Sequence, residues 1–194
     1  MKTLYYTVAC LALAFGISPQ PSPAQETNAP RFEDYAAAVV SRARVAPLDL
    51  RRGDPLARKY RTMIRQQIRE EGVNFAGRYT LASAGCGTGC SIGAIIDART
   101  GRAYFPRELQ GWTSIVGDYD PPEGENLWTF RPNSRLLRAL GRPNIGKAGE
   151  ERYGASGIYY YEWTGNRLRL VRFTHVGSYP TADPPAPSKR REKR

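Results

Sequence analysis

Hydrophobic residues recur at helical spacing between Asp54 and Gly72, and this is the clearest element in the pattern of the chain. Asp54 suits an N-cap, Pro55 suits the first helical position and Gly72 suits the position after the last turn. The stripe predicts one amphipathic helix with a core-facing side and a solvated basic side. The apolar positions are Leu56, Tyr60, Met63, Ile64 and Ile68, and the basic positions outside them are Arg58, Lys59, Arg61, Arg65 and Arg69.

Alternation with a period of two follows the helix and predicts an antiparallel meander. A first strand is expected over 74–83, where Phe75, Tyr79 and Leu81 alternate with other residues, and a returning strand over 91–96. The composition of 97–101 favours a turn, and a third strand over 102–105 ends before Pro106.

The second half of the chain predicts further strands and one clear hairpin. Strands are expected over 113–116 and 126–130, a short helix or a strand over 134–140, and a long glycine-containing loop over 141–157. The hairpin pairs 158–163 with 167–173 across the turn 164–166. The predicted fold is therefore α+β: an N-terminal amphipathic helix packed on an antiparallel β-sheet of hairpins, with a disulfide-pinned hairpin loop.

The N-terminus reads as a secretory signal peptide. Lys2 precedes an apolar run over 8–17, and small residues before a cleavage site after Ala24 complete the pattern. We therefore expect a periplasmic or secreted protein, without a transmembrane span in the mature chain. The expected divisions are 1–24 signal peptide, 25–50 linker and N-terminal arm, with 32–40 as a short helix or extended arm, 51–178 single globular domain and 179–194 disordered Pro-rich basic tail.

Export determines how the cysteines are interpreted. Of three cysteines, Cys10 leaves with the signal, so Cys86 and Cys90 remain in an oxidising compartment, with two glycines between them. We expect a structural disulfide that closes a tight loop. Thioredoxin-like chemistry uses a two-residue spacing at a helix start, whereas three residues intervene here. A transpeptidase-type cysteine would need an adjacent histidine, and Ala84 stands in its place.

The formal net charge is +11, and a dense basic run lies at the C-terminus. Such a run is commonly a solvated end, and its functional alternative is attraction to a polyanion. For an exported protein we expect an envelope polyanion or another envelope protein as partner, with no specific nucleic acid, because no recognition motif accompanies the charge. The residues of this candidate polyanion contact are Lys189, Arg190, Arg191, Lys193 and Arg194.

The densest aromatic run suggests a binding surface. Strand alternation places Tyr159, Tyr161 and Trp163 on one face and Tyr160 on the other. One set is expected to pack in the core, and the other to lie exposed beside the loop 141–157, unless the whole hairpin is core. The candidate binding surface comprises Tyr159, Tyr160, Tyr161, Trp163, Ser156 and Gly157.

No catalytic residue, metal site or cofactor is predicted. His175 is the single histidine, so a histidine-based metal site is excluded, and no nucleophile-elbow motif accompanies it. The acidic residues between 118 and 125 lack the EF-hand pattern.

Several short segments together resemble a family of uncharacterised secreted bacterial proteins. The similarity runs from about Phe32 to Phe173 and implies export and a common fold, without a mechanism. Family members often carry histidine where Arg78 stands, so a site that depended on that histidine would be missing here. The segments are Asn-Phe-Ala-Gly-Arg-Tyr (74–79), Gly-Cys-Gly-Thr-Gly-Cys (85–90), Asp-Ala-Arg-Thr-Gly (97–101), Ser-Arg-Leu-Leu (134–137) and Tyr-Tyr-Glu-Trp (160–163).

The segment 155–159 is similar to the Ser-Gly-x-x-Tyr loop of periplasmic lysozyme inhibitors, which enters the lysozyme cleft. A basic protein suits a basic lysozyme poorly, because like charges slow their encounter. The function favoured is a non-catalytic envelope binding or interaction module. The alternatives are an inhibitor or immunity-type protein against a cell-wall hydrolase, and a cell-wall enzyme that uses carboxylates.

Overall fold

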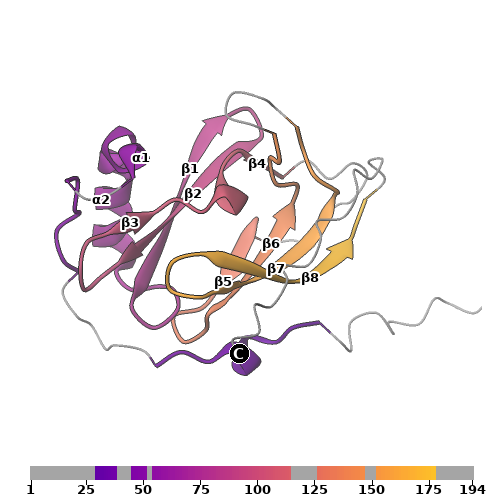
Figure 1. Cartoon of the computed structure of the whole chain (residues 1–194), viewed down its shortest axis with the longest axis horizontal. Helices are drawn as coiled ribbons and strands as arrows, with labels where there is room; N and C mark the ends of the chain where they lie inside the picture. Colours follow the sequence, from indigo (N-terminus) through magenta and orange to yellow (C-terminus); the bar gives the residue numbers. More distant parts are fainter. Residues whose placement is uncertain (1–28, 39–44, 52–53, 115–125, 147–151, 178–194) are drawn as a thin grey trace, which may run out of the picture.

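The computed structural model describes residues 29–38, 45–51, 54–114, 126–146 and 152–177, and within them two antiparallel sheets and two α-helices pack in layers. Figure 1 shows the helices beside the first sheet and the second sheet on the other side of it. The α+β class with antiparallel strands agrees with the sequence. The expectation of one sheet is wrong, because the two groups of hairpins form separate four-stranded sheets.

Two short helices take the place of the single predicted helix. α1 spans Pro55–Lys59 and α2 spans Arg61–Glu71, and Tyr60 between them has a ψ of 17°. The backbone N–H of Tyr60 still donates to Leu56 O, so a one-residue break leaves the apolar spacing intact and the sequence pattern does not reveal it. The predicted cap is present: Asp54 Oδ1 accepts from the N–H of Leu56 at 2.9 Å.

The first sheet consists of β1 (Tyr79–Gly87), β2 (Cys90–Asp97), β3 (Ala103–Tyr104) and β4 (Trp112–Thr113). β2 pairs with β1 along its length, with β3 at one end and with β4 at the other. The predicted order of the three strands in the meander is therefore confirmed. β4 ends at Thr113, and residues 115–116 of the expected strand 113–116 lie outside the described residues.

The first strand begins later than predicted because residues 75–79 form a turn, called the 75–79 turn below. Phe75 and Tyr79 exchange backbone hydrogen bonds, and Ala76 and Gly77 between them have positive φ values of 47° and 85°. Their N–H groups donate to Ser134 O at 3.1 Å and to Pro132 O at 2.6 Å. The turn thereby ties the start of the first sheet to the segment 131–135, which connects the strands 128–130 and 136–141 of the second sheet.

The second sheet has the order β5–β6–β7–β8. The sequence favours a short helix or a strand over 134–140, and the structure has the strand β6 there. The predicted hairpin is formed by β7 and β8. Trp112 of the first sheet donates its indole N–H to Leu140 O at 2.8 Å, which links the two sheets. The bounds are Trp128–Phe130 for β5, Leu136–Gly141 for β6, Gly157–Trp163 for β7 and Leu168–His175 for β8.

Two hydrophobic cores follow from strand alternation. Tyr79, Leu81 and Ile95 point toward the second sheet and join a core rich in aromatic rings. Ala82 and Ile96, on the opposite face, join a smaller core against the helices, which contribute Ala57 and Ile64. The first sheet is thus the middle layer of three, which is why its hydrophobic pattern is strong on both faces.

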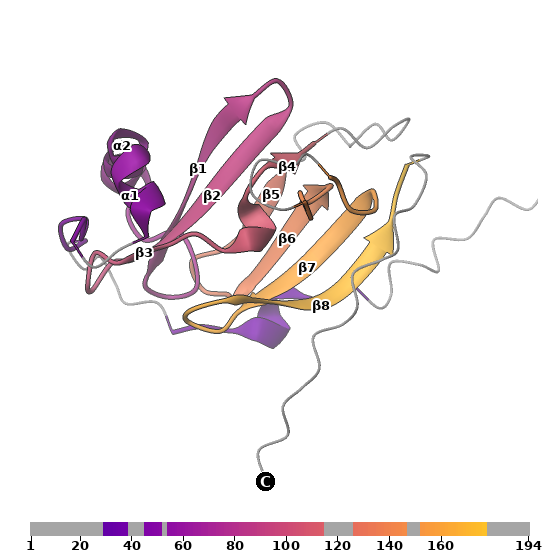
Figure 2. The same cartoon turned by 45° about the horizontal axis from the view of Figure 1, so that its top comes forward.

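The N-terminal arm, residues 31–38, lies against the second sheet, as Figure 2 shows below the orange strands. It contains a 3-10 helix, η1 (Phe32–Tyr35), followed by extended backbone. Ala36 forms a β-bridge with Ser134, and the Ser134 hydroxyl donates to Phe32 O at 2.7 Å. The arm is therefore held by specific contacts to the segment that precedes β6.

Side-chain amides hold α2 and the segment after it to the outer edge of β1. Gln67 donates to Ser83 O at 2.6 Å and accepts from the Ser83 N–H at 2.9 Å. Asn74 makes the same pair of bonds with Leu81, at 3.2 and 2.7 Å. Among the described residues, no helix has the length and hydrophobicity that a membrane crossing requires.

Candidate functional site

The predicted cysteine pair lies at the tip of the β1–β2 hairpin. Cys86 and Cys90 are joined by a disulfide, with their Cα atoms 5.1 Å apart. The preceding strand changes from buried at Tyr79 to exposed toward Gly87, so the disulfide closes the exposed end of the hairpin. This position agrees with a structural staple.

The aromatic run is core and not an exposed surface, which corrects the candidate binding surface. Tyr159, Tyr161 and Trp163 point between the two sheets and belong to the main core, as alternation predicted. Tyr160 points the other way but is only 7% exposed. Because both sets are buried, neither forms an exposed aromatic surface. For Tyr159, Tyr161 and Trp163 the cause is the inner face of the second sheet, which needs large rings to fill the space against the first.

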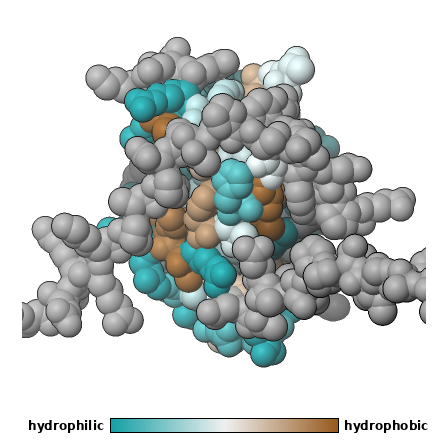
Figure 3. Space-filling model, turned by 90° about the vertical axis from the view of Figure 1, so that its right-hand side faces the viewer, coloured by the Kyte–Doolittle hydropathy of each residue, from teal (hydrophilic) through white to brown (hydrophobic). Residues whose placement is uncertain are grey.

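Ser156 and Gly157 are also buried, so they form neither a binding surface nor an insertion loop of the lysozyme-inhibitor kind. Gly157 packs so closely on Phe173 that a Cβ would collide with its ring. On the side shown in Figure 3, hydrophobic residues lie next to hydrophilic ones. Within the described part of the chain, Ile145 is the large hydrophobic side chain that is exposed, at 38%.

The remaining predicted features do not contribute to a described site. The signal peptide over 1–24, the basic residues Lys189–Arg194 and the acidic residues of 118–125 are outside the described residues. His175 is exposed at the end of β8, where its ring meets Phe173 edge-on.

One cavity among the described residues was not predicted. Its volume is about 650 Å³, and it opens between the N-terminal arm, the 75–79 turn and the end of β7. We call it the arginine cavity. Its apolar wall comprises Ala37, Ala38, Ala76 and Trp163, and its polar wall comprises Arg78, Tyr79, Arg135, Glu162, Thr164 and Gly165.

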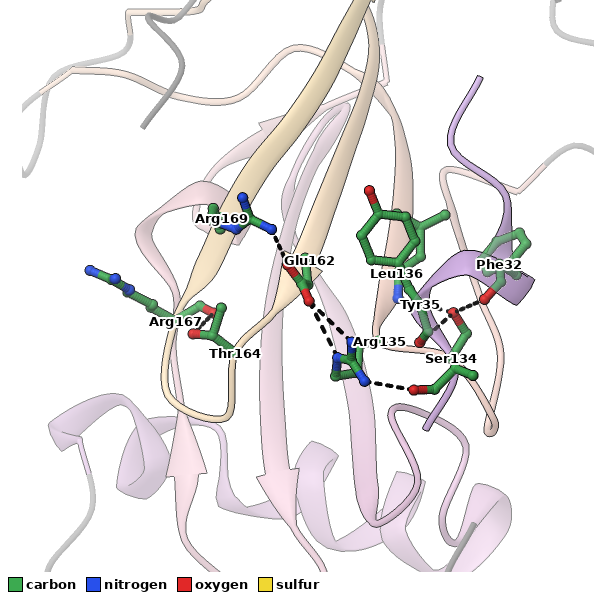
Figure 4. Close-up of polar contacts among 10 residues, drawn as sticks. Phe32, Tyr35, Ser134, Arg135, Leu136, Glu162, Thr164, Arg167 and Arg169 are labelled. Carbon is green, nitrogen blue, oxygen red and sulfur yellow. Dashed lines mark hydrogen bonds and ion pairs between the residues drawn. The ribbon is translucent and has the colours of Figure 1, made fainter. Parts of the chain in front are cut away.

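One side of the arginine cavity is an ion-pair cluster, drawn in Figure 4. Glu162 Oε1 accepts from Nε and Nη2 of Arg135, both at 3.3 Å, and Oε2 accepts from Arg169. Arg135 also donates through Nη1 to Ala36 O at 2.6 Å, which fastens the arm to this side. Burial of the Tyr35 hydroxyl, together with the negative charge of Glu162, raises the pKa of Tyr35.

The opposite side is built around Arg78. Its Nε is buried 3.3 Å from Asp97 Oδ2, an ion pair outside hydrogen-bond geometry, and its Nη2 donates to the Tyr79 hydroxyl at 3.0 Å. The guanidinium also lies over the Tyr79 ring, 5.1 Å from its centroid. Burial lowers the pKa of Arg78, but the Tyr79 and Asp97 interactions outweigh it and raise that pKa overall. Arg78 is therefore a fixed positive charge.

These contacts leave donors without acceptors. Among the described residues, Nη1 of Arg78 has no hydrogen-bond partner, and both Glu162 oxygens are already occupied by arginines. The three arginines of the two clusters carry one more charge than Asp97 and Glu162. Planar guanidinium groups suit carboxylate and phosphate oxygens, and the apolar wall suits an uncharged part of the same ligand.

The arrangement favours binding over acid–base or nucleophilic chemistry. The Thr164 hydroxyl donates to Arg167 O at 3.1 Å, and Glu162 is engaged on both oxygens. Within the described part of the chain, no group of three or more His, Cys, Asp or Glu residues is placed to hold a metal ion.

Glu162 is the feature of the sequence that could have indicated the ion-pair cluster of the arginine cavity. It is the one charged residue in the run 159–163, and the alternation that sends Tyr161 and Trp163 inward sends Glu162 outward. A carboxylate on an otherwise aromatic strand needs cationic partners, and the sequence does not show which arginines lie near it.

Comparison of the chain with family models, with curated proteins and with solved structures found no match. The function of the arginine cavity is therefore argued from its geometry alone.

Proposed function

We propose that this is an exported, periplasmic or secreted, non-catalytic binding module that holds a small anionic ligand in the arginine cavity. The observation that carries the proposal is the pair Arg78 and Arg135, which face one cavity from different elements. Each arginine is oriented by protein partners, so little side-chain entropy is lost when a ligand binds. A carboxylate or phosphate group is the expected anchor.

The test compares two sugars that differ in one group. D-glucuronate and D-glucose share a ring, and only the first carries a carboxylate. We expect glucuronate and inorganic phosphate to bind the mature protein in ligand-observed NMR and calorimetric titrations, and glucose to bind at least about tenfold more weakly, since a hydrogen bond to a charged group contributes about 1.5–3 kcal/mol.

Arg78→Gln removes the fixed charge, and Arg99→Gln is the matched control. Arg99 is exposed on the 97–101 turn and does not line the arginine cavity. We expect Arg78→Gln to abolish the preference for glucuronate over glucose and Arg99→Gln to retain it. Equal affinity for the two sugars in the unmodified protein, or equal loss in both variants, would contradict the proposal.

A second candidate function is inhibition of a cell-wall hydrolase, and one observation favours it. The β1–β2 hairpin ends in an exposed tip that the disulfide closes, a rigid shape that suits insertion into a cleft. If the tip acts in this way, the mature protein slows hydrolysis of cell-wall glycan by a lysozyme. The Cys86→Ser, Cys90→Ser double variant would then lose this inhibition while glucuronate binding persists.

The carboxylate-enzyme alternative gains no support from the two described carboxylates that pair with arginines of the cavity. Asp97 and Glu162 are each engaged by arginine, whereas a glycosidase needs one carboxyl group to give a proton and another to attack or activate water.

A further inference from the structure

A second cavity lies on the other side of the β7–β8 turn. Its volume is about 390 Å³, and β3, the segment after it and the β7–β8 turn form its walls. Thr164 and Gly165 line the arginine cavity, whereas Asn166 and Arg167 line the second cavity. The two cavities therefore share one four-residue turn as their boundary.

The second cavity is also basic. Arg102, Arg107 and Arg167 outnumber Asp54 and Glu108. The Asp54 carboxylate caps α1, and Nη2 of Arg107 donates to Ile145 O and Gly146 O. Arg102 and Arg167 are exposed and are therefore the cations placed to meet a ligand.

A continuous row of rings connects the two cavities. Tyr79 and Tyr104 each meet Trp163 edge-on, with 5.5 Å between ring centroids. An arginine lies over the outer ring at each end: Arg78 over Tyr79 and Arg102 over Tyr104, both 5.1 Å from the centroid. The two cations are thus held by one rigid wall.

The spacing of these cations follows from the sheet. Arg78 O accepts from the Ala98 N–H and Arg102 O from the Asp97 N–H, so the two arginines flank the end of β2. Two strand spacings separate their backbones by about 10 Å. Gly165, with φ of 98°, adds no side chain to the boundary between the cavities.

Figure 4 shows the side chains of Arg135 and Arg167 on opposite sides of the turn that carries Thr164. We propose that the ligand is an elongated acidic oligosaccharide, with one carboxylate at Arg78 in the arginine cavity, a second at Arg102 and Arg167, and the sugar chain across Gly165. This inference rests on the proposed function. In a glycan with an acidic sugar at every second position, successive carboxylates lie two rings apart, a length close to the separation of the backbones of Arg78 and Arg102.

The row of rings does not offer the stacking faces that single-stranded nucleic acid uses. Proteins that bind nucleic acid strands offer exposed aromatic faces on which bases stack. Tyr79 and Trp163 are buried and already engaged edge-on.

The experiment uses hyaluronan oligosaccharides as probes and the full mature chain. The disaccharide carries one glucuronate and the tetrasaccharide carries two, separated by an amino sugar. We expect the tetrasaccharide to bind at least about tenfold more tightly than the disaccharide, because its second carboxylate binds intramolecularly. Tetra-N-acetylchitotetraose, of the same length but neutral, is expected to bind no more tightly than the disaccharide.

Variants separate the two cavities. Arg102→Gln, and independently Arg167→Gln, should reduce tetrasaccharide affinity to that of the disaccharide, whereas Arg99→Gln should keep the tenfold difference. The exposed position of all three side chains keeps folding intact, and thermal melting checks this.

Each failure has its own meaning. A disaccharide that binds through Arg78, with a tetrasaccharide that binds no more tightly, would overturn the two-cavity inference alone. If neither oligosaccharide nor glucuronate binds, the proposed function fails too. A dT4 oligonucleotide that binds more tightly than the tetrasaccharide would overturn the assignment to acidic glycans.

Discussion

Glu162 shows how one residue can couple three parts of the molecule. Its neighbours in β7 point into the core, while its own carboxylate, 15% exposed, meets Arg135 from the segment before β6 and Arg169 from β8. Through Arg135 the same cluster reaches the backbone of the arm at Ala36. Removing the negative charge leaves two arginines close together without their shared partner.

Replacing Glu162 therefore tests the cluster. We expect Glu162→Gln to lower the free energy of unfolding by about 1.5–3 kcal/mol, the range for hydrogen bonds to charged groups. Glu71→Gln, at an exposed site at the end of α2, is the matched control and should change it by less than about 0.5 kcal/mol. Urea denaturation measures both, and similar values for the two variants would contradict the role assigned to Glu162.

Buried tyrosines make the stability sensitive to alkaline pH. Burial raises the pKa of Tyr159 and of Tyr161 above the ordinary value of 10.0. The folded state keeps both phenols protonated, while the unfolded state loses these protons as pH rises past about 10. The contribution of these protonated phenols to the free energy of unfolding is thus complete below pH 10. It is lost as pH rises toward the pKa of each tyrosine in the folded state, by up to about 1.4 kcal/mol per pH unit for each tyrosine. Denaturation of Tyr161→Phe should show a shallower decline above pH 10, and a decline as steep as that of the unmodified protein would refute this.

At the scale of elements, local sequence patterns predicted the features that are held by contacts between residues close in sequence. The cap at Asp54, the 97–101 turn and the β7–β8 hairpin are present because their hydrogen bonds join residues a few positions apart. The start of β1 was misplaced because the 75–79 turn is held by Ser134 and Pro132, which are distant in sequence. The separation into two sheets likewise depends on contacts that no local period encodes.

The 75–79 turn supplies a test of how the arm is held. Gly77 and Gly72 both have positive φ, but a Cβ on Gly77 would collide with Ala38 O, whereas one on Gly72 meets nothing within 4 Å. Gly72, with φ of 60° and ψ of −138°, has a backbone conformation that favours glycine, so Gly72→Ala should cost about 1–3 kcal/mol from backbone conformation alone. Gly77→Ala should cost more, and it should speed amide exchange at Ala37, whose N–H donates to Asn133 O. Unchanged exchange at Ala37 would show that the arm does not depend on this glycine.

Over the whole molecule, the two sheets share one core. Trp112 of the first sheet meets Trp128 and Tyr159 of the second edge-on, and the arginine cavity lies where the same two layers meet the arm. Sequence reasoning found the rings of this core but not the cavity. Arg78, Arg135 and Glu162 belong to three separate segments that only the packed layers bring together.

A shared core predicts unfolding as a single unit. The three tryptophans lie at 112, 128 and 163, so their fluorescence reports on both sheets, while far-UV circular dichroism reports on all secondary structure. We expect the urea transitions from the two signals to coincide. Two separated transitions would mean that one sheet persists without the other.

The side-chain amides of Gln67 and Asn74 also cover part of the edge of β1. β1 is the outer strand of its sheet, and an outer strand offers free N–H and C=O groups to any other extended chain. A side-chain amide carries one donor group and one acceptor, as a peptide unit does, and at Ser83 and Leu81 these two amides fill the places where a foreign strand would bond. This edge is therefore closed to strand addition, and the chain is protected there against assembly into aggregates.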